Sequence, residues 1–381
     1  LYVNTSFGRA MSYNYWFNWA ITLAVEISAA TIIMKYWFPD VSPAIISGLF
    51  FSLILTINLF SVRVFGEMEY LLSFIKVAVI ITFIVLCCFL IGKHTTMSIH
   101  HLFIAGGPFH HGWLGFFSVF LVAGFAFQGA ELMGISAGET KDPQKNIPKA
   151  VKTIFWRLIL FYIITTLFIS LLIPFNDPAL AHQNSVDSSP FTLIFQNYFG
   201  HGLAANIINF VVLIAIVSAA NASMYAATRT LWHMGSAGQA PKVFSKITSY
   251  GLPIYALAGT ALIGSCVFLS SLVGSGVLFT ALLTISALCG FIAWFGIALT
   301  HLFFRRRYLK NNPTPLLYKA KLFPYAPILA IAFIGIIIIG QGYGLIEHFA
   351  WSSLLKQYGA LIVFITIMMA CVIKNNDKKN N

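Results

Sequence analysis

The fold is decided by one stretch of the sequence, GFAFQGAELMGISAGETKDPQKNIPKAV, which runs from Gly124 to Val151. It places Gly124, Gly129 and Gly134, with Glu131 among them, at the end of an apolar run long enough to cross a membrane. An ionisable group inside a bilayer costs several kcal/mol unless it faces a cavity or a partner. A helix that only contacted lipid would have no use for it, so the stretch predicts a helix with a further role.

The composition of the whole chain indicates a polytopic membrane protein. Hydrophobic residues make up 59% and charged residues only 9% of its 381 residues, and the mean hydropathy is +0.83, far from the balance of soluble domains. About 20 apolar residues cross the hydrocarbon core, and no alternating pattern suggests a β-barrel. We therefore expect an all-α fold in one transmembrane domain, residues 1–381. The expected spans are about 14–36, 42–62, 71–92, 113–137, 153–174, 204–226, 255–275, 279–303, 324–342 and 353–373.

The net charge of +12 is explained by topology. Of the 23 Lys and Arg residues, 19 fall in loops on one side of the predicted spans and three on the other, with Lys76 left inside a span. This asymmetry predicts a multi-pass protein with both termini in the cytoplasm. Contact with anionic membrane lipid is a secondary use of these charges. Nucleic-acid binding is disfavoured, because no soluble domain is present to carry it.

The sequence contains little that would support a metal site, a bound cofactor or enzyme catalysis. The five cysteines lie in or at the edge of apolar spans, where they behave as small hydrophobic residues. Two histidine pairs, His100–His101 and His110–His111, have no carboxylate or cysteine nearby in the loop, which favours an aqueous loop over a metal site. No catalytic triad or phosphate-binding loop occurs at usable spacing. We expect neither an enzyme nor a resident cofactor.

Polar residues recur along the first predicted span. Asn14, Asn18, Thr22 and Glu26 are four residues apart, which stacks them on one helix face. We expect this face to point into the helix bundle. For the Asn and Thr side chains, hydrogen bonds that hold helices together remain an alternative to a functional role. For Glu26, a place in the substrate pathway is favoured, so it joins the predicted substrate-binding residues.

The span 113–137 is too long for a single straight crossing. Its 25 residues would make a helix of about 37 Å, against about 30 Å of hydrocarbon. A helix broken around residues 125–130 fits better, with Gly124 and Gly129 easing the unwound backbone. Unwound backbone at this depth must line a cavity, and broken helices mark substrate sites in transporters, where carbonyls at the end of the outer half suit an ammonium group. A glycine-rich helix that packs closely against its neighbours is the alternative.

The segment FQGAELMGISAGETKDPQKNIPKAV resembles the signature of amino acid permeases of the amino acid-polyamine-organocation superfamily, and further matches cover almost the whole chain. These are NYWFNWAITLAVEISAA (14–30), SVRVFGEMEYLLSFIKV (61–77), SSPFTLIFQ (188–196), SAANASMYAATRTL (218–231) and GFIAWFGIALTHLFFRRRY (290–308). The resemblance implies an inverted-repeat transporter fold of five plus five helices and two more. The matched segments place the start of this chain just before the third helix. We therefore expect about ten helices, without the first two of that fold.

The resemblance also implies roles for residues around the predicted break. Phe125 matches an aromatic position that closes over bound amino acid. The segment from Ala126 through Phe127 to Gly129 matches the unwound part that contacts the substrate ammonium. Glu131 matches an acidic position of substrate recognition and gating.

Two further residues have implied roles in the transport cycle. Glu139 matches the cytoplasmic end of the same helix and is expected to contribute to the inner gate. Lys76 lies about 8 Å into its span. Without the family resemblance, we would expect its long side chain to reach back to the cytoplasmic surface. In proton-coupled members a matching lysine stands where sodium-coupled relatives bind an ion, which implies ion coupling by protons.

The implied function is import of a cationic amino acid, L-lysine, by proton symport with alternating access in a bacterial inner membrane. Two carboxylates and one ammonium inside spans also favour a cationic substrate, but this balance does not separate lysine from arginine, ornithine or histidine. Two alternatives stay open. The first alternative is a substrate-sensing protein that contacts a membrane-bound regulator. The second is a truncated permease without function.

Overall fold

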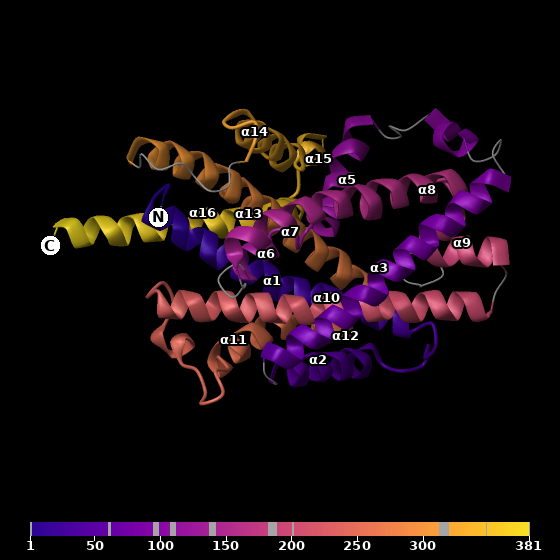
Figure 1. Cartoon of the computed structure of the whole chain (residues 1–381), viewed down its shortest axis with the longest axis horizontal. Helices are drawn as coiled ribbons and strands as arrows, with labels where there is room; N and C mark the ends of the chain where they lie inside the picture. Colours follow the sequence, from indigo (N-terminus) through magenta and orange to yellow (C-terminus); the bar gives the residue numbers. More distant parts are fainter. Residues whose placement is uncertain are drawn as a thin grey trace.

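The computed structural model describes residues 2–59, 62–93, 99–106, 112–136, 142–181, 189–199, 202–311, 320–347 and 349–380. These residues form helices and connecting turns, and none of them lies in a strand (Figure 1). The first half contains α1 (Thr5–Met34), α2 (Pro43–Leu59), α3 (Val62–Lys93), η1 (His101–Gly106), α5 (Gly112–Ala126), α6 (Leu132–Ser136), α7 (Pro143–Leu158), η3 (Ile159–Ile164), α8 (Thr165–Leu172), η4 (Pro178–Ala181) and α9 (Pro190–Phe199). The second half contains α10 (Leu203–Ser236), η6 (Lys242–Ser245), α11 (Ile254–Gly264), η7 (Ser265–Leu269), α12 (Ser270–Val273), α13 (Ser275–Asn311), α14 (Tyr325–Gly340), α15 (Tyr343–Glu347) and α16 (Trp351–Asn380).

Eight helical segments of the described chain are long and apolar enough to cross a membrane. Two shorter apolar helices accompany them, α2 with 17 residues and the segment Gly115–Ala126 of α5. At 1.5 Å per residue, α2 measures about 25 Å, a little less than the hydrocarbon thickness. The predicted all-α polytopic membrane fold is confirmed.

Helix α1 forms the centre of the bundle. It contacts α10 and α13 most extensively, and also α2, α11 and α16. Asn14 bonds the carbonyl of Cys289 and Ser28 bonds the carbonyl of Ser275, so α1 and α13 run antiparallel. The most apolar window of α1 is 72% buried within the protein, against 6% for that of α16. The first helix therefore packs mainly against protein, and the last leaves most of its surface for lipid.

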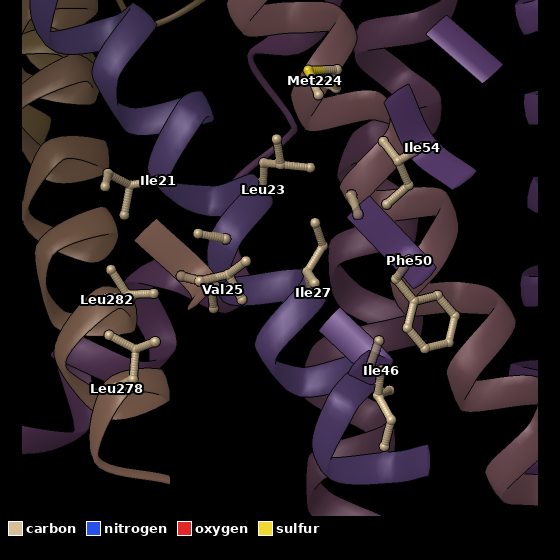
Figure 2. Packing of buried hydrophobic residues seen from close by; sticks show 14 of the residues in the cluster. Ile21, Leu23, Val25, Ile27, Ile46, Phe50, Ile54, Met224, Leu278 and Leu282 are labelled. Carbon is tan, nitrogen blue, oxygen red and sulfur yellow. The ribbon is translucent and has the colours of Figure 1, made fainter. Parts of the chain in front are cut away.

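The largest apolar cluster joins α1 to α2, α10 and α13. Figure 2 shows Leu23 and Ile27 of α1 between Phe50 of α2 and Leu282 of α13, with Met224 of α10 above them. In a bilayer, water does not drive helices together, so close van der Waals packing has to hold them. This cluster fixes α1, and the polar residues on its other faces are positioned with it.

The N and C labels lie toward the same end of the long axis of the molecule (Figure 1).

Candidate functional site

The backbone is broken between α5 and α6. Helix α5 ends at Ala126, residues 127–131 form turns, and α6 begins at Leu132. The break therefore starts two residues later than the expected 125–130. Gly129 has a φ of +102°, a conformation that favours glycine because it has no Cβ.

Gly124 has a different role from the predicted one. It lies within α5, and a Cβ added there would be 2.5 Å from Cε2 of Phe291 on α13. Gly124 thus permits a close approach of two helices, which was the alternative explanation for the glycines. Of the two glycines that were expected to ease the unwound backbone, Gly124 and Gly129, only Gly129 has a positive φ.

Glu131 is the last residue of the break, and its carboxylate is held from two sides. The backbone N–H of Gly129 lies 3.3 and 3.2 Å from its two oxygens, and the indole Nε1 of Trp294 on α13 donates to Oε2 at 3.1 Å. The carboxylate is therefore fixed in position at the start of α6.

Glu131 lies in the wall of a cavity of about 900 Å³. The cavity is bounded by the first half of α1, by α6, by the end of α10 and by the second half of α13. Arg229 of α10 lies on another wall, with its guanidinium 5.4 Å from the ring centre of Tyr225 and 5.8 Å from that of Trp232. The described lining residues are Tyr2, Met11, Ser12, Tyr15, Glu131, Gly134, Arg229, Thr230, Trp232, His233, Ala293, Gly296, Ile297, Thr300, His301 and Phe304.

A polar network ties the break to the two central helices. The side chain of Gln128 accepts from Asn18 Nδ2 at 3.1 Å and donates to the carbonyl of Ser286 at 2.9 Å. The Ser286 hydroxyl donates to Asn18 Oδ1 at 3.1 Å and lies 2.8 Å from the hydroxyl of Thr22. Asn18 is fully buried, Thr22 is 3% exposed and Asn14 is 6% exposed. The prediction that this side of α1 faces into the bundle is confirmed. Asn14, Asn18 and Thr22 make hydrogen bonds to other segments of the bundle, which was the alternative to a functional role for these side chains.

A second, smaller cavity lies farther along α1. Its volume is about 300 Å³, and Glu26 and Lys76 are in its wall together with apolar residues of α3, α9 and α10. The ammonium of Lys76 donates to the hydroxyl of Ser218 on α10 at 2.8 Å, and Ser218 is fully buried. Lys76 thus reaches into the bundle instead of toward the membrane surface.

The sequence model of the family described as "Amino acid permease" matches residues 2–381. The chain belongs to the amino acid permease family. It is 42% identical to the lysine-specific permease LysP of Lactococcus lactis over 389 residues, which cover 99% of this chain and 76% of that protein. It is 41% identical to the lysine-specific permease LysP of Escherichia coli over 96% of this chain and 77% of that protein. Its identity to the histidine permease HisP of Lactococcus lactis is 40%, over 99% of this chain and 80% of that protein. The permease is accordingly an amino acid transporter of the membrane and not an enzyme.

The permease brings only part of the predicted substrate-binding set to the larger cavity. Glu131 lines it. Phe125 packs against the central apolar cluster, and Ala126 is exposed on α5. Phe127 stacks on Tyr162 of the π-helical segment η3, with ring centres 4.6 Å apart and an angle of 23° between the rings.

The other predicted residues lie away from this cavity. Glu26 is in the smaller cavity with Lys76, so the two residues assigned to different roles share one site. Glu139 lies outside the described residues, in the stretch 137–141. The argument for a cationic substrate counted the charges of Glu26, Glu131 and Lys76 together. The structure places Glu131 in the larger cavity and the other two in the smaller one.

Sequence reasoning missed the partners of the predicted residues. Trp294 holds Glu131, Ser286 closes the network with Gln128, and Ser218 receives the bond from Lys76. Each is a polar or amphipathic residue inside an apolar run, which is a signal for interhelical contact. The sequence does not indicate which partner each one meets, because the partners lie more than 100 residues apart in the chain.

Proposed function

We propose that this permease imports a cationic amino acid, with L-lysine as the preferred substrate, by proton symport with alternating access. The observation that carries the proposal is the fixed carboxylate of Glu131 in the wall of the cavity of about 900 Å³. A carboxylate already held by Gly129 and Trp294 needs little reorganisation to accept a substrate ammonium. Arg229 on another wall complements the substrate's carboxylate. The cavity thus offers both charges that a free amino acid requires.

The choice of lysine rests on the relatives. Two proteins named lysine-specific permeases are 42% and 41% identical to this chain, but a histidine permease is 40% identical. The identities are too close to decide between these substrates. Competition between lysine, histidine, arginine and ornithine is therefore part of the test.

Proton coupling is supported by the position of Lys76. A fixed ammonium between α3 and α10, bonded to Ser218, repels a sodium ion from the same place. Protons are then the remaining common driving ion. We also propose, from the distribution of Lys and Arg over the loops, that both termini lie in the cytoplasm of a bacterial cell, with the chain in the inner membrane.

The experiment is uptake of radiolabelled lysine into liposomes that contain the purified chain, with and without an inward proton gradient. Glu131→Gln keeps the size of the side chain and removes its charge. Loss of a charged hydrogen bond of about 1.5–3 kcal/mol predicts a half-saturation concentration about ten- to a hundredfold higher. The matched control is Asp40→Asn, which makes the same change at an exposed residue after α1. Unchanged affinity in Glu131→Gln would remove Glu131 from the substrate site.

The same assay separates transport from sensing. A substrate sensor that contacts a regulator, or a permease that has lost its function, would show no gradient-dependent uptake in a folded and inserted sample. Lysine binding without uptake identifies the sensor, and neither binding nor uptake identifies a chain without function.

A further inference from the structure

Helix α7 begins a helical run that is longer than the membrane is thick. The run from Gln144 to Leu172, through α7, η3 and α8, has 29 residues and would measure about 43 Å, against about 30 Å of hydrocarbon. Its later part, residues 153–172, contains a single charged residue, Arg157, and is long enough to cross by itself. The first part of α7 therefore extends into the headgroup region at one surface of the bilayer.

Three lysines and a tryptophan share one face of this extension. They are spaced by four, three and four residues, as Lys145, Lys149, Lys152 and Trp156, which stacks them along one side of a helix. The three lysines are called the lysine stripe below. All four side chains are exposed, Trp156 to 55%. The sequence of α7 contains no Asp or Glu, so no side chain of the helix neutralises this face.

The rest of the described chain leaves the lysine stripe open. Among the described elements, α7 has extensive contact only with η3, its own continuation. Ile147, Val151 and Ile154 lie on the face opposite the lysines, so the helix is amphipathic. An amphipathic helix with lysines on its polar face is typical of segments that lie at a membrane surface.

The aromatic residues beside the lysine stripe favour lipid as its occupant. Phe155 is 58% exposed and Trp156 55%, and aromatic rings at this position lie where headgroups meet acyl chains. The lysine stems can follow the same apolar surface and place their ammonium groups among the headgroups. Five Lys and Arg residues fall between 141 and 157, and such a cluster beside a span attracts anionic lipid. A soluble acidic protein would match the lysines but would not reach the rings, which lie in lipid.

We propose that the lysine stripe of α7 is a binding site for the phosphate groups of anionic phospholipids in the adjacent leaflet. The three ammonium groups donate to phosphate oxygens, and Trp156 lies at the boundary with the acyl chains. The same helical run continues into η3, where Tyr162 stacks on Phe127 of the break with ring centres 4.6 Å apart. Bound lipid thus holds at a fixed depth the helix against which the break packs. The site does not depend on which amino acid is transported.

The test is the affinity of the purified chain for phosphatidylglycerol and for zwitterionic phosphatidylcholine, measured by native mass spectrometry as the chain is released from detergent. The unaltered chain should prefer phosphatidylglycerol. The preference should fall by at least about fivefold, the contribution of one lysine near an anionic surface, in the triple variant Lys145→Gln, Lys149→Gln and Lys152→Gln. Arginine at the same three positions should keep it. The matched control removes three exposed lysines outside α7, by Lys242→Gln, Lys310→Gln and Lys321→Gln, and should stay within about twofold of the unaltered chain.

Two results would overturn the proposal. Equal affinity of the unaltered chain for the two lipids would leave the lysine stripe to an acidic protein partner or to solvent. Equal loss in the α7 variant and in the control would show that net charge, and not this helix, attracts the lipid. Because the three lysines are exposed, all variants should unfold at the same temperature in detergent without phosphatidylglycerol. If the triple glutamine variant does not, the single variant Lys149→Gln, with an expected loss of about fivefold, decides.

Discussion

Gly290 on α13 lies against the side chain of Gln128, and its replacement by alanine should disrupt the polar network. A Cβ at this position would overlap the Gln128 amide nitrogen and lie 2.9 Å from its Cδ. Carbon atoms in contact are normally about 3.5–4.0 Å apart. The Gln128 amide must therefore move, and it cannot then keep its bonds to both Asn18 and the Ser286 carbonyl.

The size of the effect follows from these contacts. Two hydrogen bonds contribute about 1 kcal/mol each, and overpacking costs about 1–3 kcal/mol. Alanine is favoured over glycine in a helix by about 1 kcal/mol. The net expectation is that Gly290→Ala lowers the free energy of unfolding by about 2–4 kcal/mol and slows lysine uptake, because Gln128 lies in the break next to Glu131.

The assay is thermal unfolding of the purified chain in detergent, with lysine exchange measured on the same sample in liposomes. Gly335→Ala is the matched control, since it makes the same change in helix α14 where a Cβ meets no atom within 4 Å. It should be neutral or slightly stabilising. If Gly290→Ala unfolds at the temperature of Gly335→Ala and exchanges lysine normally, Gln128 does not have the position or the importance given to it here.

Three further variants test the residues around the break. Trp294→Phe removes the indole bond to Glu131 and should raise the half-saturation concentration for lysine about tenfold; an unchanged value in the uptake assay would contradict a positioning role. Gly129→Ala places a side chain at a φ of +102° and should destabilise the chain by about 1–3 kcal/mol in thermal unfolding, whereas Gly134→Ala, where a Cβ has open space, should not. Phe127→Leu loses the stacking on Tyr162 and should lower stability by about 0.5–1.5 kcal/mol with unchanged lysine affinity; altered affinity would return Phe127 to the substrate site.

The features that the sequence predicted well are local ones. Apolar runs of about 20 residues indicate spans by themselves. The four-residue spacing of Asn14, Asn18 and Thr22 determines a common helix face, and the structure buries all three. A break near Glu131 was expected from the length of the run and its glycines, and the error was two residues at its start.

The features that were predicted poorly depend on packing between distant parts of the chain. Gly124 and Gly129 look alike in the sequence, but one meets Phe291 and the other adopts a positive φ. Glu131 and Trp294 are 163 residues apart, and no local pattern joins them. The division of Glu26 and Glu131 between two cavities likewise depends on where α10 and α13 pack against α1.

The central position of α1 has a consequence for biosynthesis. Its polar side chains are satisfied by α13 and by the break after α5, and its apolar surface is covered largely by α10. Counted from Asn18, the break is synthesised more than 100 residues later. Helix α10 begins more than 180 residues later, and α13 more than 250 residues later. If α1 entered the bilayer alone during that interval, the amides of Asn14 and Asn18 would face hydrocarbon without their final partners, an unfavourable state. Helix α1 should therefore stay beside the insertion machinery, or in a watery site near it, until the later helices arrive.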